Sequence, residues 1–266
     1  SGGAGRALGY DSAMATAELR ESLKQRACET IDRLKNDLVG ISTDIHAHPE
    51  ENWEEVFAHS RLTDALGDNG HDVRRKAYDL ETAFELRTGN KGATVAVLCE
   101  YDALPGIGHG CGHNIIAAAG LGAGLALAPL AEEAGGRLRL MGTPAEEGGG
   151  GKIEMARRGA FDGVQAAMMV HPYDTDLARM NAIAIQHALV KYVGEAAHAA
   201  VAPHKGRNAL DAAVLGYMNV AALRQHIMPT ERIHGIFLKG GEKPNIVPRE
   251  TEMDWYVRSN TISTLQ

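Results

Sequence analysis

Cysteine and aromatic residues are scarce in this chain of 266 residues. Only three cysteines occur, Cys28, Cys99 and Cys111, and Phe, Trp and Tyr together make up 5% of the sequence. An odd number of cysteines without a repeating spacing does not form a disulfide framework, so stability must come from a packed core. This cysteine usage favours a reducing compartment, and we expect a cytoplasmic protein.

Excess positive charge and long apolar runs are also missing. The 27 Lys and Arg residues are outnumbered by 34 Asp and Glu residues, and the net charge of −7 argues against nucleic-acid or anionic-membrane partners. The longest apolar stretch, residues 115–130, is interrupted by glycines and a proline, and it falls short of the ~18 residues of a membrane span. Residues 1–16 show no signal-peptide pattern and are expected to form a flexible lead.

Helical patterns and short apolar strands alternate in residues 17–181. This alternation predicts an α/β domain built on right-handed parallel crossovers. Asn114 is the expected N-cap of one helix. The expected helices cover residues 17–40, 54–67, 114–130 and 151–159, and the expected strands cover 93–99, 136–142 and 163–172.

The pattern changes in residues 182–266. Alternating polar and apolar residues there indicate strands that are buried on one face only, and they surround a single helix. We therefore expect a smaller α+β domain and place the domain boundary near residue 181. The expected strands cover residues 182–194, 233–239 and 250–258, and the helix covers 208–225.

Reactive side chains of the first region follow the predicted strands. They are Glu100, Asp102, Cys111 and His113 after the first strand, Glu146 and Glu147 after the second, and His171 at the end of the third. Because the carboxyl ends of parallel strands meet at one edge of a sheet, we expect these side chains to converge. Thiolate, imidazole and carboxylate groups are the ligands of Zn²⁺ and other first-row divalent ions. The sequence therefore predicts a metal centre.

Other interpretations of these residues are weaker. Taken singly, each has an ordinary structural explanation, but their coincidence at three consecutive strand ends favours the metal centre. A closed structural zinc site needs four ligands at tight paired spacing, whereas here the ligands are far apart and Glu146 is a spare carboxylate. A cysteine hydrolase using Cys111 and His113 would leave His171 and the Glu pair without roles. Metal-assisted hydrolysis uses them all.

Several motifs resemble those of the co-catalytic metallopeptidase and amidohydrolase family, which includes aminoacylase, carnosine dipeptidases, auxin-conjugate hydrolases and aminobenzoyl-glutamate hydrolase. They are "DIHAHPEENWEE", "EYDALPGIGHGCGHN", "GTPAEEGGGGK", "VHP", "GEAAHAAVAPHKGRNALDA" and "KPNIVP". The match is closest for the branch with a cysteine ligand, and within it for dipeptidases of the β-alanyl-lysine type. The resemblance implies an α/β fold with a three-layer phosphorylase/hydrolase-like catalytic domain and an inserted α+β lid domain.

The resemblance also assigns a metal centre residue by residue. Cys111, His113, Glu147 and His171 match the family's metal ligands, and the cysteine thiolate would bridge two divalent ions, Zn, Mn or Co. Glu146 matches the general base that takes a proton from the water. The implied reaction is hydrolysis of an amide bond by a metal-activated water.

Five further residues match positions around that centre. Asp102 matches a carboxylate that orients a ligand, and His109 is expected to lie behind the ligands rather than on the metal. His198 matches a lid histidine that stabilises the oxyanion, in dimeric relatives across the subunit interface. Asn245 and Arg258 match lid positions that hold polar groups of the substrate. A homodimer through the lid is therefore expected.

The resemblance implies a dipeptide substrate first, and an N-acyl amino acid or aminobenzoyl-glutamate as the alternative. Two departures stand out: Asn114 replaces an Asp found in many relatives of the cysteine branch, and family members continue past the equivalent of Gln266. That continuation completes the lid and supplies the last histidine ligand, so we expect a C-terminally truncated chain. A hypothesis of another class is therefore an inactive fragment or a regulatory binding module.

Overall fold

Two sheets organise the chain, one in each of its two units. The computed structural model describes residues 4–178 and 182–266, with side chains from residue 16 onward. The units comprise Ser1–Thr175 and Asp176–Gln266. The boundary expected near residue 181 lies outside the described residues, and the lid function of the second unit stays a prediction.

The first sheet has five strands in the order β1-β2-β4-β3-β5. Its central strands β4, β3 and β5 are parallel, as the alternation of strands and helices predicted, and β2 and β1 extend it in antiparallel orientation. β5 is shorter than expected, so His171 lies on the loop that follows it. The strands are β1 (Arg74–Arg75), β2 (Phe84–Thr88), β3 (Thr94–Cys99), β4 (Arg137–Gly142) and β5 (Ala166–Met168).

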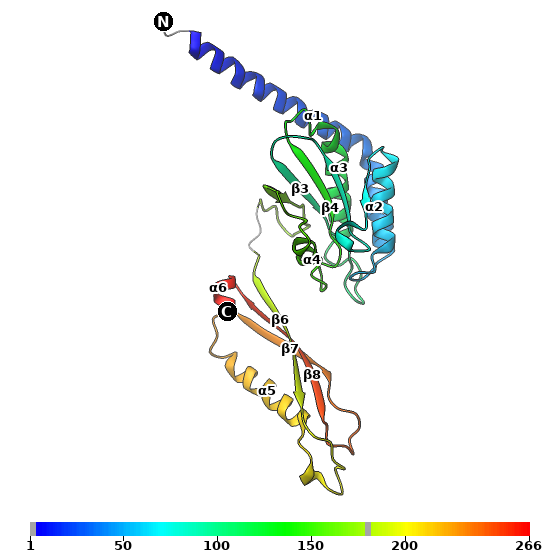
Figure 1. Ribbon diagram of the computed structural model, residues 1–266, viewed down its shortest axis with the longest axis vertical. Coiled ribbons are helices and arrows are strands. Elements are labelled where there is room, and N and C mark those ends of the chain that lie inside the picture. Colours follow the sequence, from blue (N-terminus) through cyan, green and yellow to red (C-terminus); the bar gives the residue numbers. More distant parts are fainter. Residues whose placement is uncertain (1–3, 179–181) are drawn as a thin grey trace. The chain divides into compact units, whose positions relative to one another are not determined.

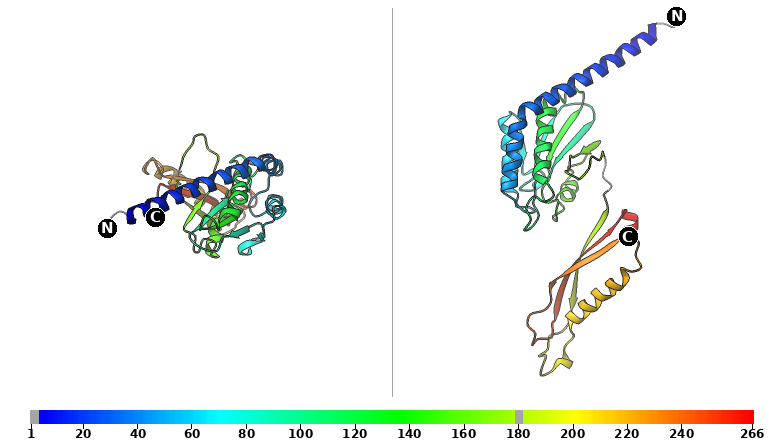
Figure 2. Two further views of the ribbon diagram at one scale, coloured as in Figure 1. Left: turned by 90° about the horizontal axis from the view of Figure 1, so that it is seen from above. Right: turned by 180° about the vertical axis from the view of Figure 1, so that it is seen from behind.

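Helices cover both faces of this sheet and complete three layers (Figures 1 and 2). α1, α2 and α3 pack together on one face, where Ile45, Leu62 and Leu121 meet Leu140 of β4 in the larger core. α4 packs on the other face through Met155. The expected three-layer fold is confirmed. The helices are α1 (Ala4–Ala47), α2 (Val56–Asp68), α3 (His113–Leu127) and α4 (Gly151–Arg157), with short 3-10 turns at Ala77–Asp79 and Ala128–Leu130.

α1 is longer than the apolar spacing predicted. It takes in residues 4–16, which were expected as a flexible lead, and it runs past Gly40 to Ala47. No proline precedes Pro49, and this part of the sequence is rich in alanine, the residue with the highest helix propensity, so nothing stops the helix earlier.

α3 is the central helix of the first core. An 18-residue window from His113 to Leu130 is apolar enough, by length and composition, to cross a membrane, but 72% of it is buried inside the protein. Its glycines allow close packing, because a methyl group on Gly120 would overlap the Sγ of Cys99. The expected N-cap is wrong: Gly112 with φ +78° precedes the helix, and the Asn114 amide instead donates to the Ser42 hydroxyl at 2.9 Å.

The second unit is an antiparallel sheet in the order β6-β8-β7 with one helix packed on it. Ala213 of α5 packs on Met253 and Trp255 of β8. The Asn208 side chain caps α5 by accepting hydrogen bonds from two backbone N–H groups. The elements are β6 (Ala184–Val193), a 3-10 turn at Pro203–Lys205, α5 (Ala209–Leu223), β7 (Arg232–Lys239), β8 (Glu250–Ser259) and α6 (Ile262–Leu265).

Candidate metal centre

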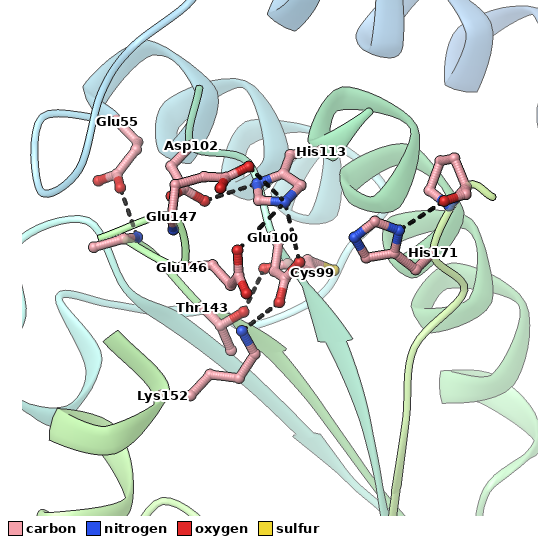
Figure 3. A network of polar contacts seen from close by, with 12 residues as sticks. Glu55, Cys99, Glu100, Asp102, His113, Thr143, Glu146, Glu147, Lys152 and His171 are labelled. Atoms are coloured by element: carbon pink, nitrogen blue, oxygen red, sulfur yellow. Dashed lines mark hydrogen bonds and ion pairs between the residues drawn. The ribbon is translucent and has the colours of Figure 1, made fainter. Parts of the chain in front are cut away.

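Acidic side chains surround one buried histidine at the carboxyl ends of β3 and β4 (Figure 3). His113, the first residue of α3, belongs to two groups of side chains that could bind a metal ion. The potential ligand atoms of Glu100, His113 and His171 lie within 4.8 Å of one another, and so do those of His113, Glu146 and Glu147. The convergence expected from the parallel topology is therefore present.

Asp102 fixes the orientation of His113. The Nδ1 of His113 lies 2.9 Å from Oδ1 of Asp102, and Oδ2 of Asp102 accepts a hydrogen bond from the Glu147 backbone N–H at 2.8 Å. When Nδ1 carries the proton, the lone pair of Nε2 is available to a metal ion. This Nε2 lies 3.4 Å from a carboxylate oxygen of Glu100 and 3.7 Å from oxygens of Glu146 and Glu147.

Several atoms of this cluster are buried without a hydrogen-bond partner. Among the residues that the structure describes, they include Nε2 of His113, Oε2 of Glu100 and Oε1 of Glu147. Leaving a buried polar atom unpaired is unfavourable, so such a cluster calls for an explanation. All three atoms offer lone pairs, and they converge on one place. The residues present therefore fit a divalent cation.

Hydrogen bonds and charges in the cluster shift the pKa values of His113 and Asp102. Burial opposes protonation of His113, but the hydrogen bond to Asp102 and the surrounding carboxylates outweigh it and raise the pKa of the imidazole. Burial also opposes ionisation of Asp102, yet its hydrogen bonds to His113 and to the Glu147 N–H lower the pKa of that carboxyl. Asp102 is thus held as a carboxylate against the ring.

Cys111 and Glu146 lie in the same negative environment. The pKa of the Cys111 thiol is raised to about 11, first by a hydrogen bond with the Glu147 side chain and then by burial and the nearby carboxylates. Burial and the charge of Glu100 raise the pKa of Glu146. A bound cation would offset these negative charges and favour the thiolate and carboxylate forms.

His109 and His171 occupy the margin of the cluster. His171 is exposed; its ring centroid lies 5.9 Å from that of His113, and its Nδ1 lies 2.8 Å from the carbonyl oxygen of Pro172. His109 is buried near His46, with 6.2 Å between ring centroids and no hydrogen-bond partner in the described structure for either ring nitrogen. Within the described residues, His109 belongs to neither group of potential metal ligands.

The remaining predicted residues lie in the second unit. His198 pairs with Ile246 in an isolated bridge, and the Ala199 N–H donates to the carbonyl oxygen of Asn245 at 3.1 Å, so His198 and Asn245 are neighbours. Arg258 lies near the end of β8, roughly 25 Å along the strand from its start at about 3.3 Å per residue. The structure therefore brings His198 and Asn245 together and separates Arg258 from both.

Glu100 and Lys152 are part of the site although the sequence analysis gave them no role. Glu100 is almost fully buried and forms an ion pair with the Lys152 ammonium group. The signal for Glu100 was its position directly after a predicted strand. Lys152 follows a run of glycines, and its spacing alone does not show that α4 carries it to Glu100.

Comparisons with known proteins place the chain in a family. The sequence pattern of Peptidase family M20/M25/M40 matches residues 96–262, and the chain belongs to this family. The resemblance seen in the motifs is thereby confirmed.

Two curated relatives share most of this chain. The Xaa-Arg dipeptidase of Mus musculus is 42% identical over 264 residues, which cover 94% of this chain and 61% of the relative. A p-aminobenzoyl-glutamate hydrolase from Escherichia coli strain K12 is 34% identical, over 90% of this chain and 54% of the relative. This chain thus spans about three fifths of the length of its mouse relative.

Solved structures share the fold. An aminobenzoyl-glutamate utilization protein from Klebsiella pneumoniae matches with a TM-score of 0.73 at 21% identity, covering 91% of this chain and 71% of that protein. The Bacillus subtilis YXEP protein, a dinuclear metal binding peptidase, matches with a TM-score of 0.64 at 19% identity, covering 88% and 66%. At these identities the likeness concerns the fold, and it agrees with a catalytic α/β domain joined to an α+β domain.

Proposed function

We propose that this chain is the metal-binding part of a metal-dependent hydrolase that cleaves the amide bond of a dipeptide. The observation that carries the proposal is the pair Glu146 and Glu147, which faces the unpaired Nε2 of the buried His113. One carboxylate of such a pair can bind metal while the other handles protons. The Xaa-Arg dipeptidase that is 42% identical supports the substrate class.

The proposed metal ligands are Cys111, His113, Glu147 and His171, joined by Glu100. We propose two divalent ions, Zn, Mn or Co, and the YXEP protein, a dinuclear metal binding peptidase of similar fold, supports that number. When bound, such ions polarise the scissile carbonyl and make water more acidic.

The chain's own residues would handle the proton. The Glu146 side chain is 42% exposed, so water and substrate can reach it, and its raised pKa suits a proton acceptor near neutral pH. Glu146 would take a proton from the attacking water and later deliver it to the nitrogen of the leaving amine. Asp102 would hold His113 and the Glu147 backbone in place. His198 would donate a hydrogen bond to the oxyanion.

Charge at the C-terminal residue distinguishes the two candidate substrates. The mouse relative is an Xaa-Arg dipeptidase, so a basic C-terminal residue is the first proposal. The Escherichia coli relative supports p-aminobenzoyl-glutamate, whose C-terminal residue is acidic, as the second. Neither preference follows from the residues of the cluster itself.

Assembly through the second unit and a cytoplasmic location belong to the proposal. β6 forms an edge of its sheet, and its outward-facing Ile185, Leu189 and Val193 are 49%, 62% and 77% exposed. An edge strand with exposed apolar side chains favours pairing with a second copy of the chain. Sedimentation that shows a monomer at micromolar concentration would contradict the homodimer.

A substrate panel with matched Glu variants tests the hydrolase. Xaa-Arg dipeptides, β-alanyl-lysine, N-acetyl amino acids and p-aminobenzoyl-glutamate are incubated with the wild type, Glu146→Gln and Glu147→Gln, each with Zn²⁺, Mn²⁺ or Co²⁺. We expect Glu146→Gln to lower turnover about 100-fold or more while bound metal is unchanged, because only the proton acceptor is lost. Glu147→Gln should lower the amount of bound metal.

Other results would change the assignment. If Glu146→Gln loses metal and Glu147→Gln keeps it, the two carboxylates have exchanged roles. Unchanged turnover in Glu146→Gln would refute the general base. A wild-type chain that hydrolyses nothing would favour the inactive fragment or binding module.

A further inference from the structure

Glu55 is a buried carboxylate to which the proposed function gives no role. It belongs to the motif "DIHAHPEENWEE", directly precedes α2 and is 0% exposed. Its Oε1 accepts hydrogen bonds from the backbone N–H groups of Ala145 at 2.7 Å and Trp53 at 3.0 Å. Its Oε2 accepts one from the Thr82 hydroxyl at 2.8 Å. Both oxygens are thus fixed by donors from three segments of the chain.

Ala145 is the residue at which the chain turns into the Glu pair. It is fully buried and has φ +55°, in the left-handed region that residues other than glycine rarely adopt. Its carbonyl oxygen accepts a hydrogen bond from the Gly151 N–H at 3.1 Å, at the start of α4. Glu55 therefore satisfies the N–H of a strained, buried residue immediately before Glu146 (Figure 3).

A second contact joins the same two loops independently of Glu55. A methyl group on Gly149 would overlap the indole of Trp53 and would lie 2.6 Å from Cβ of Ala145. The segment before α2 and the loop after β4 are therefore packed against each other without spare room.

We propose that Glu55 is a positioning residue for the Glu pair: through the Ala145 N–H it holds the left-handed turn that directs Glu146 and Glu147 toward His113. The inference rests on the proposed function, since that function gives the two carboxylates their roles. Glu55 itself touches neither substrate nor metal.

Glutamine at this position should preserve the contacts, and alanine should not. A Gln side chain keeps a carbonyl oxygen for the two N–H groups, and its amide can donate to the Thr82 oxygen, because a hydroxyl can also accept. Glu55→Ala leaves the Ala145 N–H buried and unpaired. Glu50 offers a matched control from the same motif, since its carboxylate accepts from the Phe57 and Ala58 N–H groups and caps only α2.

Hydrogen–deuterium exchange of the metal-free chain reads the turn directly. We expect exchange in residues 144–151 to speed up at least about 10-fold in Glu55→Ala and to stay at the wild-type rate in Glu55→Gln. Glu50→Ala should speed exchange only in the first turn of α2. Wild-type exchange of residues 144–151 in Glu55→Ala would overturn the proposal whatever the activity.

Co²⁺ affinity and hydrolysis of an Xaa-Arg dipeptide then test the consequence. Glu55→Ala should weaken Co²⁺ binding about 10- to 100-fold and lower kcat more than it raises KM, whereas Glu55→Gln and Glu50→Ala should match the wild type. Faster exchange with unchanged kcat and Co²⁺ affinity would overturn the positioning role. A wild type that neither binds Co²⁺ nor hydrolyses the dipeptide would refute the proposed function, and the positioning role would fall with it.

Discussion

His113 is the residue on which the candidate site depends. Its Nδ1 faces Asp102, while its Nε2 faces Glu100, Glu146 and Glu147 from within a buried position. One imidazole thus connects a carboxylate behind it with three carboxylates before it. The geometry suits a histidine whose outer nitrogen binds metal while its inner nitrogen is held by a carboxylate.

The pH dependence of stability should report the buried state of Glu55. Burial raises the pKa of the Glu55 carboxyl above its ordinary value of 4.5. A carboxyl whose pKa is raised in the folded state contributes fully below the unfolded pKa, and this contribution is lost as the pH rises through the folded pKa. We therefore expect the free energy of unfolding of the wild type to fall, relative to that of Glu55→Gln, as the pH rises above 4.5.

Urea unfolding at a series of pH values from about 4 to about 8 measures this difference. Trp53 fluorescence in a Trp255→Phe background restricts the signal to the first unit, because these are the two tryptophans of the chain. A difference between wild type and Glu55→Gln that stays constant with pH would contradict a raised pKa.

The elements with a regular apolar pattern were predictable, because that pattern directly reflects burial. β3 and β4 read as strands buried on both faces, and their parallel pairing brings Glu100, Asp102, Glu146 and Glu147 to one edge. The start of α3 at His113 was not predictable from a capping side chain, since it depends on the left-handed backbone of Gly112. The contact of Lys152 with Glu100, like that of Glu55 with Ala145, depends on tertiary packing that local sequence does not encode.

Two helix glycines should respond to alanine with opposite signs. In α3, a methyl group on Gly120 would overlap the Cys99 sulfur and lie 3.0 Å from the Leu98 carbonyl oxygen, so Gly120→Ala should destabilise the first unit by about 1–3 kcal/mol. In α1, nothing lies within 4 Å of a methyl group on Gly40. Gly40→Ala should therefore stabilise the protein by about 0.5–1 kcal/mol, through the higher helix propensity of alanine.

Thermal and urea unfolding of both variants, again followed by Trp53, provide the measurement. Equal effects of the two substitutions would show that helix propensity alone acts. The close packing of α3 on β3 would then not be a source of stability.

At the scale of the whole molecule, the candidate centre is assembled from distant parts of the chain. The loop before α2, the ends of β3 and β4, the start of α3 and the loop after β5 all contribute. The rule that ligands bind at the carboxyl ends of parallel strands was enough to predict most of this convergence. It says nothing about His198, Asn245 and Arg258, which lie in the other unit, and their roles rest on the resemblance to the family.

Binding of Co²⁺ to the metal-free chain tests the candidate metal centre most directly, with absorption spectra recorded during titration of the wild type, Cys111→Ser and His113→Ala. We expect saturable binding to the wild type with a sulfur-to-cobalt charge-transfer band in the near ultraviolet. Cys111→Ser should lack that band, and His113→Ala should bind Co²⁺ much more weakly, because His113 belongs to both ligand groups. Absence of saturable binding to the wild type, or a spectrum that neither substitution changes, would contradict a metal centre on these residues.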